Sequence, residues 1–204
     1  MNDQKNTVPR KRWFLFTWSG WLIGVVLVVL LSILMESLSH EVHVQFVVGF
    51  GMAIGLGAMQ GMALRSSGIA AAKWALATTS AFLLPYLIAD LLLLTNDLRA
   101  EVVLAAATVL GAALAAVLQA RVIPVASFRS VMRWSLAHTT AWALAYAWTM
   151  GLLWASNAYK DVLPGWLAVI MAFGSLLTGG PLLALLTHGP VQRLLSAAQD
   201  QCRT

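Results

Sequence analysis

The sequence has few charged residues, and this shortage excludes most water-soluble folds. Charged residues make up 10% of the 204 residues, hydrophobic residues make up 60%, and the mean hydropathy is +0.79. A chain of this composition has too few polar side chains to cover a globule in water. We therefore expect the lipid bilayer to be the environment in which this chain folds.

Cysteine is nearly absent, and so are the common catalytic motifs. The one cysteine, Cys202, excludes an intrachain disulfide and a zinc site built from cysteines. The chain contains no His-Glu-x-x-His, no Gly-x-Ser-x-Gly, no phosphate-binding loop and no paired aspartates within an apolar stretch. Because so few ionisable groups are left for acid–base chemistry, we expect neither an enzyme nor a bound cofactor.

What the sequence does have is a series of long apolar runs. A helix needs about 20 mostly apolar residues to cross a hydrocarbon core of about 30 Å. Six stretches reach that length, which predicts an all-α, six-helix transmembrane bundle forming a single domain over residues 1–204, with short tails at 1–11 and 191–204. The predicted spans are Trp13–Met35, Val44–Leu64, Trp74–Leu94, Val102–Ala120, Trp134–Ala155 and Gly165–Leu186.

The basic residues between the spans predict the orientation of the chain. The net charge is +5, but the basic residues form short clusters that would meet lipid headgroups, so we expect no nucleic-acid partner. The predicted turns place only Arg99 and Lys160 on one side of the membrane. The other side carries Lys5, Arg10, Lys11, Arg12, Arg65, Lys73, Arg121, Arg129, Arg133, Arg193 and Arg203. By the positive-inside rule, this second side and both termini are cytoplasmic.

Two short motifs recur along the chain. A cation followed by tryptophan opens three spans, as Arg12-Trp13, Lys73-Trp74 and Arg133-Trp134. We interpret these pairs as interface anchors, with the cation among headgroups and the indole N–H in water. The other three spans end on a small-x-x-(Gln or Thr)-small pattern, at 57–61, 116–120 and 175–179.

The spacing of these motifs predicts a threefold repeat. The tryptophan motif recurs at offsets of 61 and 60 residues, and the second motif recurs twice at 59. We therefore predict three tandem helical hairpins near residues 12–65, 73–121 and 133–190, related by pseudo-threefold symmetry about an axis along the membrane normal. Chance similarity among alanine-rich helices is the alternative interpretation.

The second motif gives the first candidate site. Gln60, Gln119 and Thr178 are expected at equal depth near the cytoplasmic ends of three equivalent helices. An amide within a membrane is costly unless it is hydrogen-bonded. These three side chains therefore either bond one another and the backbone as packing contacts, or form a polar ring that lines a vestibule. The sequence leaves both interpretations open.

A histidine and an aspartate inside predicted spans are further candidates. His138 takes the place of a threonine in the repeat, and it is a candidate for hydrogen bonding, proton relay or haem binding. A bis-histidine haem would need a second intramembrane histidine, and the predicted spans contain none. Asp90, toward the outer end of the third span, either reaches interfacial water or is a functional carboxylate.

The stretch from Gly57 to Arg65, followed by 73–78, resembles a loose group of uncharacterised bacterial polytopic proteins. These proteins repeat a Gly-x-x-Gln-x-x-x-Leu-Arg element before a Trp-led helix, and the ending 174–179 is similar to their closing element. The second copy departs from the pattern, since no Leu-Arg follows Gln119. The resemblance implies a multi-pass protein of a bacterial cytoplasmic (inner) membrane, and it lends no activity.

Two classes of function remain open. One is a non-enzymatic subunit or accessory protein that packs against other proteins, lipids or pigments. The other is a carrier or channel for a small solute, with its path along the pseudo-threefold axis. The lack of a polar pathway through the full thickness favours the first. The expected partners are the lipid bilayer and either another membrane protein or a second copy of this chain.

Overall fold

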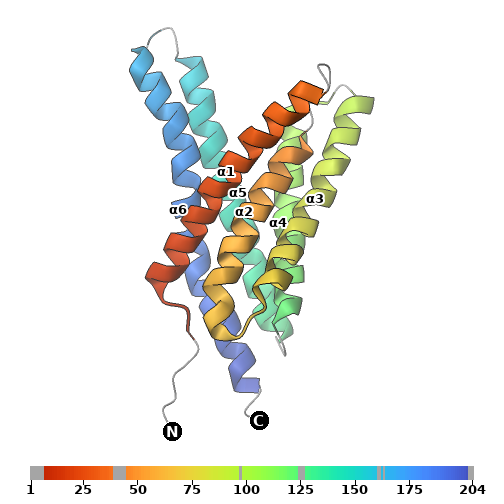
Figure 1. Cartoon of the computed structure of the whole chain (residues 1–204), viewed down its shortest axis with the longest axis vertical. Helices are drawn as coiled ribbons and strands as arrows, with labels where there is room; N and C mark the ends of the chain where they lie inside the picture. The colour runs from red at the N-terminus through yellow and green to blue at the C-terminus, as the bar shows by residue number, and fades with distance from the viewer. Residues whose placement is uncertain are drawn as a thin grey trace.

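The computed structural model describes residues 7–38, 45–96, 98–123, 127–159, 162 and 164–201 (Figure 1). Within these residues the fold is all-helical and contains no strand, which confirms the predicted class. The elements are α1 (Arg10–Leu38), α2 (Phe46–Leu64), the 3₁₀ turn η1 (Arg65–Ser67), α3 (Ala71–Thr95), α4 (Ala100–Val122), α5 (Phe128–Ala158) and α6 (Gly165–Gln201). Val44, the predicted start of the second span, lies outside the described residues.

Five of these helices, α1, α2, α3, α4 and α6, are long and apolar enough to cross a membrane. The remaining predicted span, Trp134–Ala155, corresponds to α5, which has 31 residues but is not among the five. Its interior contains His138 together with threonine, tyrosine and tryptophan residues, and these side chains lower its hydropathy. Several of them, described below, are buried inside the bundle.

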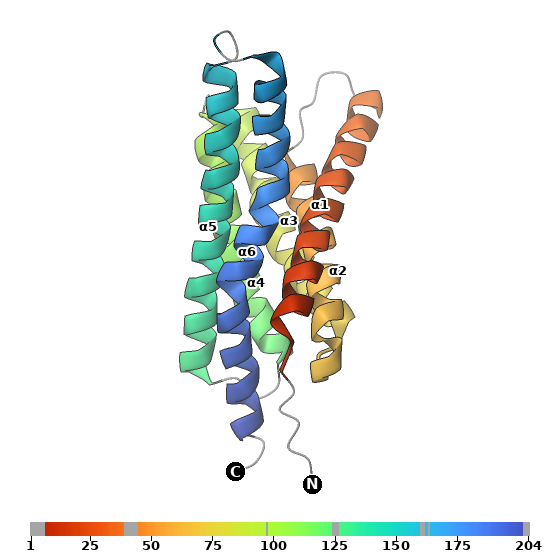
Figure 2. The ribbon, with the colours of Figure 1, turned by 90° about the vertical axis from the view of Figure 1, so that its left-hand side faces the viewer.

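The helices form a closed ring. Each packs against the next in the chain, and α1 also packs against α6. α1 begins and α6 ends at the same end of the bundle, which we call the near end; the opposite end is the far end (Figures 1 and 2). In both views α1 diverges from α6 toward the far end.

Small residues allow α1 and α2 to approach closely. A Cβ added at Gly20 of α1 would lie 2.8 Å from the backbone oxygen of Gly55, and one added at Gly24 would lie 2.9 Å from the Cα of Met52. On another face of α2, a Cβ at Gly57 would lie 2.9 Å from the Cβ of Thr78 in α3. Close approach of this kind is how helices associate in lipid, and the glycines of α2 permit it because they carry no side chain.

The last helix is longer than predicted, because it continues past Leu186 to Gln201. Three buried residues, Val191, Leu194 and Leu195, repeat at helical spacing and pack in the near-end core, so burial favours the extra turns. Prolines lie inside the helix at positions 181 and 190. The missing N–H of Pro181 leaves the carbonyl of Leu177 without its helical donor, and the indole of Trp18 donates to that oxygen at 3.3 Å.

Candidate functional site

Three tryptophans from alternate helices lie in the near-end core. Trp13 of α1, Trp74 of α3 and Trp134 of α5 are each no more than 1% exposed and belong to one apolar cluster. We call these three tryptophans the near layer. The ring centroids of Trp74 and Trp134 are 6.1 Å apart, although α4 separates their helices in the chain. Alternate helices therefore meet inside the ring.

This arrangement corrects the prediction for the three interface anchors. The cationic partners Lys73 and Arg133 are exposed and Arg12 is half-buried, as an interface position requires. The tryptophan part of the prediction is wrong, because all three indoles are buried inside the bundle. A tryptophan one turn into a helix lies within reach of an interior core as well as of the headgroups, and here the ring of helices surrounds it.

A set of buried polar side chains lies beside the near layer, and we call it the polar belt: Thr17, Gln60, Thr78, Gln119, His138 and Thr187. Gln119 Nε2 donates to Thr78 Oγ1 at 2.9 Å, and Thr78 in turn donates to the backbone oxygen of Trp74 at 2.9 Å. At the junction of the first and last helices, Trp13 Nε1 donates to Thr187 Oγ1 at 3.1 Å. The belt thus forms hydrogen bonds between helices.

Thr178 is not part of this belt, so the predicted polar ring is wrong at its third member. Thr178 is exposed; its hydroxyl donates to Gly174 O at 2.7 Å and accepts from Trp148 Nε1 at 2.8 Å. Its neighbours in α6 lie against Trp21, two helical turns or about 12 Å along α1 from Trp13. The buried threonine of α6 that belongs to the belt is Thr187, nine residues later, which accepts a hydrogen bond from Trp13.

Several belt atoms have no hydrogen-bond partner among the described residues. They are Thr17 Oγ1, Gln60 Nε2, Gln119 Oε1, both ring nitrogens of His138, and the neighbouring indole nitrogens of Trp74 and Trp134. Buried polar atoms are nearly always hydrogen-bonded, and each unsatisfied one costs about 1–3 kcal/mol. This set holds both donors and acceptors.

His138 lies between aromatic rings. Its ring centroid is 4.8 Å from that of Trp134 and 6.5 Å from that of Trp142, and the side chain is 1% exposed. No group of three or more His, Cys, Asp or Glu side chains that fits a metal ion occurs in the described residues. The contacts observed for this histidine are aromatic packing.

A second aromatic group lies two turns further along the same three helices. Trp21, Phe82 and Trp142 form this middle layer, with ring centroids 6.0 Å apart for the two tryptophans and 4.6 Å apart for Phe82 and Trp142. All three side chains are buried. Aromatic rings therefore occupy the interior of the ring of helices at this level.

An apolar cavity of about 190 Å³ lies on the far side of the middle layer. All six helices contribute to its lining, which is mostly valine, methionine and aromatic side chains. The lining residues are Trp21, Val25, Val28, Val29, Val48, Gly49, Met52, Phe82, Tyr86, Thr108, Trp142, Tyr146, Thr149, Met150 and Leu176.

The hydroxyl groups around this cavity are already hydrogen-bonded. Thr108 donates to Leu104 O at 2.8 Å, so the hydroxyl of Tyr86, 2.7 Å from Thr108 Oγ1, is the donor in that pair. Thr149 donates to Ser175 O at 3.4 Å. Since these donors are used, the walls offer an occupant chiefly hydrocarbon and aromatic contacts.

The cavity is reached from the side of the bundle. Two of its lining residues are exposed on the surface: Val29 of α1 is 50% exposed and Met150 of α5 is 41% exposed. Trp21 Nε1 donates to Leu176 O at 2.6 Å, and beyond that contact α1 diverges from α6 (Figures 1 and 2). The cavity therefore opens on the lateral surface of the bundle, where Val29 and Met150 are exposed.

No protein-family model, curated protein or solved structure matches this chain. The resemblance to repeated bacterial membrane proteins therefore stays a prediction. The site has to be interpreted from its own residues.

Asp90 has a structural role at the far end. Its carboxylate is 8% exposed and accepts hydrogen bonds from the backbone N–H groups of Gln45, at 2.6 Å, and Phe46, at 2.8 Å. These groups begin α2, where backbone donors lack helical partners and the helix dipole favours a negative charge. The sequence suggested either contact with interfacial water or a functional carboxylate, and it did not suggest this interaction with the backbone.

The cavity itself was missed by the sequence analysis. Its lining comes from all six helices, and no short motif marks such a set. One signal was present: eight residues after each tryptophan of the near layer there is another aromatic residue, Trp21, Phe82 or Trp142. That spacing places two aromatic side chains on the same face of each helix.

Proposed function

We propose that this chain is a non-enzymatic integral membrane protein that binds an apolar molecule, or the apolar part of a lipid or pigment, in the cavity of its far half. The observation that carries the proposal is the cavity itself. It combines apolar walls, hydroxyl groups that are already bonded, an aromatic floor and an opening on the side of the bundle.

The proposed arrangement in the membrane is six spans with the near end in the cytoplasm, and α5 is the span of lowest hydropathy. Its 31 residues correspond to about 46 Å of helix, more than enough for a hydrocarbon core of about 30 Å. Among the described residues, Arg99 is at the far end, whereas the near end carries Arg10, Lys11, Arg12, Arg65, Lys73, Arg121, Arg129, Arg133 and Arg193. This asymmetry supports the orientation by the positive-inside rule.

We also propose that the bundle is built from three tandem hairpins with pseudo-threefold symmetry. Three equivalent positions on α1, α3 and α5 support it. The near-layer tryptophans are followed four residues later by the buried Thr17, Thr78 and His138, and eight residues later by the middle layer. The contact between α1 and α6 that closes the ring supports it as well.

The size of the cavity limits the ligand. A cavity of about 150 Å³ lined by aliphatic and aromatic residues is large enough for benzene, whereas sites for drug-sized molecules occupy about 300–1,000 Å³. At about 190 Å³ this cavity fits one ring or a short length of hydrocarbon chain. The remainder of a longer molecule would extend past the exposed Val29 and Met150 into the bilayer.

The alternative of a small-solute carrier with an axial path is less well supported. The middle layer and the near layer both fill the interior with aromatic side chains. A polar solute following the axis would have to displace both layers. The burial of Gln60 and Gln119 inside the bundle is the one observation that supports this alternative.

The proposal is tested by identifying the molecules that co-purify with the protein. The protein is extracted gently from its native membrane, and bound molecules are extracted and quantified by mass spectrometry. A single apolar compound at close to one molecule per chain is the expected result. Val25→Phe places a ring in the cavity and should reduce that compound at least fivefold. Val29→Phe, at the exposed rim, should do the same with less disturbance of the core.

Val26→Phe is the matched control, because Val26 is 56% exposed and does not line the cavity. It introduces the same ring on the neighbouring position of α1 and should leave the bound compound unchanged. Equal binding to the wild type and to both cavity variants would contradict the proposal. A polar solute lost only from Gln60→Leu with Gln119→Leu would favour the carrier instead.

A further inference from the structure

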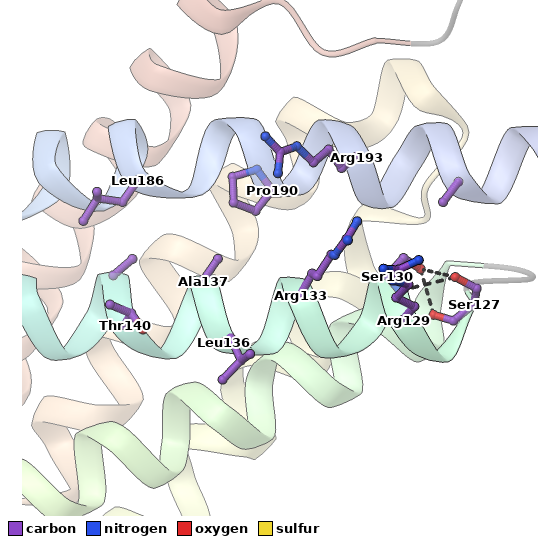
Figure 3. Close-up of a pocket in the computed structure, with 12 residues that line it drawn as sticks. Ser127, Arg129, Ser130, Arg133, Leu136, Ala137, Thr140, Leu186, Pro190 and Arg193 are labelled. Carbon is purple, nitrogen blue, oxygen red and sulfur yellow. Dashed lines mark hydrogen bonds between the residues drawn. The ribbon is translucent and has the colours of Figure 1, made fainter.

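The near half of the bundle has a second concave surface, between α5 and α6. It is a groove of about 720 Å³ whose lining includes Arg129 and Arg133 of α5 and Arg193 of α6 (Figure 3). Toward the middle of the helices the lining becomes apolar, with Leu136, Ala137 and Leu186. This groove is separate from the cavity proposed above, since the two share no lining residue.

Among the described residues, the three arginines have no anionic neighbour in the groove. None of the residues that line it is acidic. The hydrogen bonds drawn in Figure 3 join Ser127 to Ser130, and none joins an arginine to another lining residue. Ser127 accepts from the backbone N–H of Ser130 at 3.3 Å and so caps the start of α5 itself. Among the residues that the structure describes, no partner is recorded for any of the three guanidinium groups in the groove.

We propose that this groove binds one anionic phospholipid, with its phosphate among Arg129, Arg133 and Arg193 and an acyl chain against the apolar half. Guanidinium groups bind phosphate through paired N–H donors. The arginines lie at the end of the helices, at headgroup depth, and Leu136 and Leu186 lie at the depth of acyl chains. This inference needs the helices to cross a membrane, and it does not depend on the far-half cavity.

The groove selects a lipid over a soluble anion because its two halves differ in chemistry. A free phosphate ion would use the three arginines and leave the apolar half without an occupant. A zwitterionic lipid would place its own cation among the arginines, which costs binding energy. An anionic phospholipid matches the charged half and the apolar half together.

The test measures lipid binding to the whole purified protein by native mass spectrometry, with phosphatidylglycerol and phosphatidylcholine titrated separately. Phosphatidylglycerol should bind as one tight equivalent, and phosphatidylcholine should not. Each arginine near an anionic lipid surface contributes about fivefold, so Arg133→Gln with Arg193→Gln should weaken phosphatidylglycerol about 25-fold. The matched control is Arg65→Gln with Arg121→Gln, which removes the same charge from exposed near-end positions outside the groove.

A third variant separates the lipid from the bare anion. Ala137→Phe fills the apolar half without changing charge, and it should weaken phosphatidylglycerol while keeping the protein folded by circular dichroism. Equal loss in the control pair, equal binding of phosphatidylcholine, or displacement of the lipid by equimolar inorganic phosphate would each overturn the proposal. Undiminished binding in Ala137→Phe would overturn the placement of the acyl chain.

Discussion

Thr78→Val should destabilise the protein more than Gln119→Leu, although the two side chains share one hydrogen bond. The hydroxyl of Thr78 accepts from Gln119 Nε2 at 2.9 Å, and Gln119 Oε1 has no partner among the described residues. Valine has nearly the shape of threonine but removes the acceptor. The Gln119 amide, which is 0% exposed, would then lose its one recorded side-chain hydrogen bond.

The expected magnitudes follow from that asymmetry. An unsatisfied buried polar group costs about 1–3 kcal/mol, and interhelical hydrogen bonds in membranes average about 0.6 kcal/mol. Thr78→Val should therefore cost about 1–2 kcal/mol. Gln119→Leu loses the same bond but also removes a buried oxygen that has no partner, so its stability should lie within about 1 kcal/mol of wild type. Thr78 would still donate to the carbonyl of Trp74.

The decisive comparison is the double variant, measured by reversible unfolding in mixed detergent micelles with helicity as the signal. Adding Gln119→Leu to Thr78→Val removes the orphaned amide, so the double variant should be more stable than Thr78→Val alone. Thr95→Val is the control, because Thr95 is exposed and bonds only within its own helix, to Leu91 O. A double variant less stable than Thr78→Val would refute this account of the belt.

Three further predictions concern other contacts. Asp90→Asn should cost about 1 kcal/mol, because a neutral amide replaces the charge that accepts the first N–H groups of α2; unchanged stability to unfolding would contradict this role. Gly55→Ala should cost about 1–3 kcal/mol by separating α1 from α2, while Gly151→Ala, with open space around it, should be neutral or stabilising. Trp13→Phe should lower the melting temperature more than Trp74→Phe, since of these two indole N–H groups only that of Trp13 has a partner among the described residues; equal losses would argue against that bond.

The periodic and compositional features of the fold were predictable from sequence. Each predicted span overlaps a helix by most of its length, because a run of apolar residues in a bilayer has no better way to satisfy its backbone. The glycine spacing of α2 also indicated close packing, since a missing side chain acts locally. The end of α6 was not predictable in this way. Gly189 and Pro190 suggest a stop, and only the packing of Leu194 in the near-end core favours continuation.

The candidate site was predictable only in part. Gln60 and Gln119 are buried, as a polar residue in an apolar helix suggests, but their third partner depends on where α6 crosses α1. The register between two helices distant in sequence is set by side-chain packing, and Thr178 fitted the motif without lying at the right level. The buried indole of Trp13 shows the same limit: a short motif does not reveal which side of the helix faces the core.

The proposed function requires an apolar molecule to enter the far-half cavity, and photolabelling tests this most directly. A lipid carrying a diazirine at the end of its acyl chain is incorporated into membranes with the protein, activated by light, and located by peptide mass spectrometry. The cavity-lining Val28, Val29 and Met150 should be labelled well above the exposed Leu87 and Leu91 of α3. Val25→Phe should abolish that preference. Even labelling of all exposed helix faces, unchanged by Val25→Phe, would contradict the proposed function.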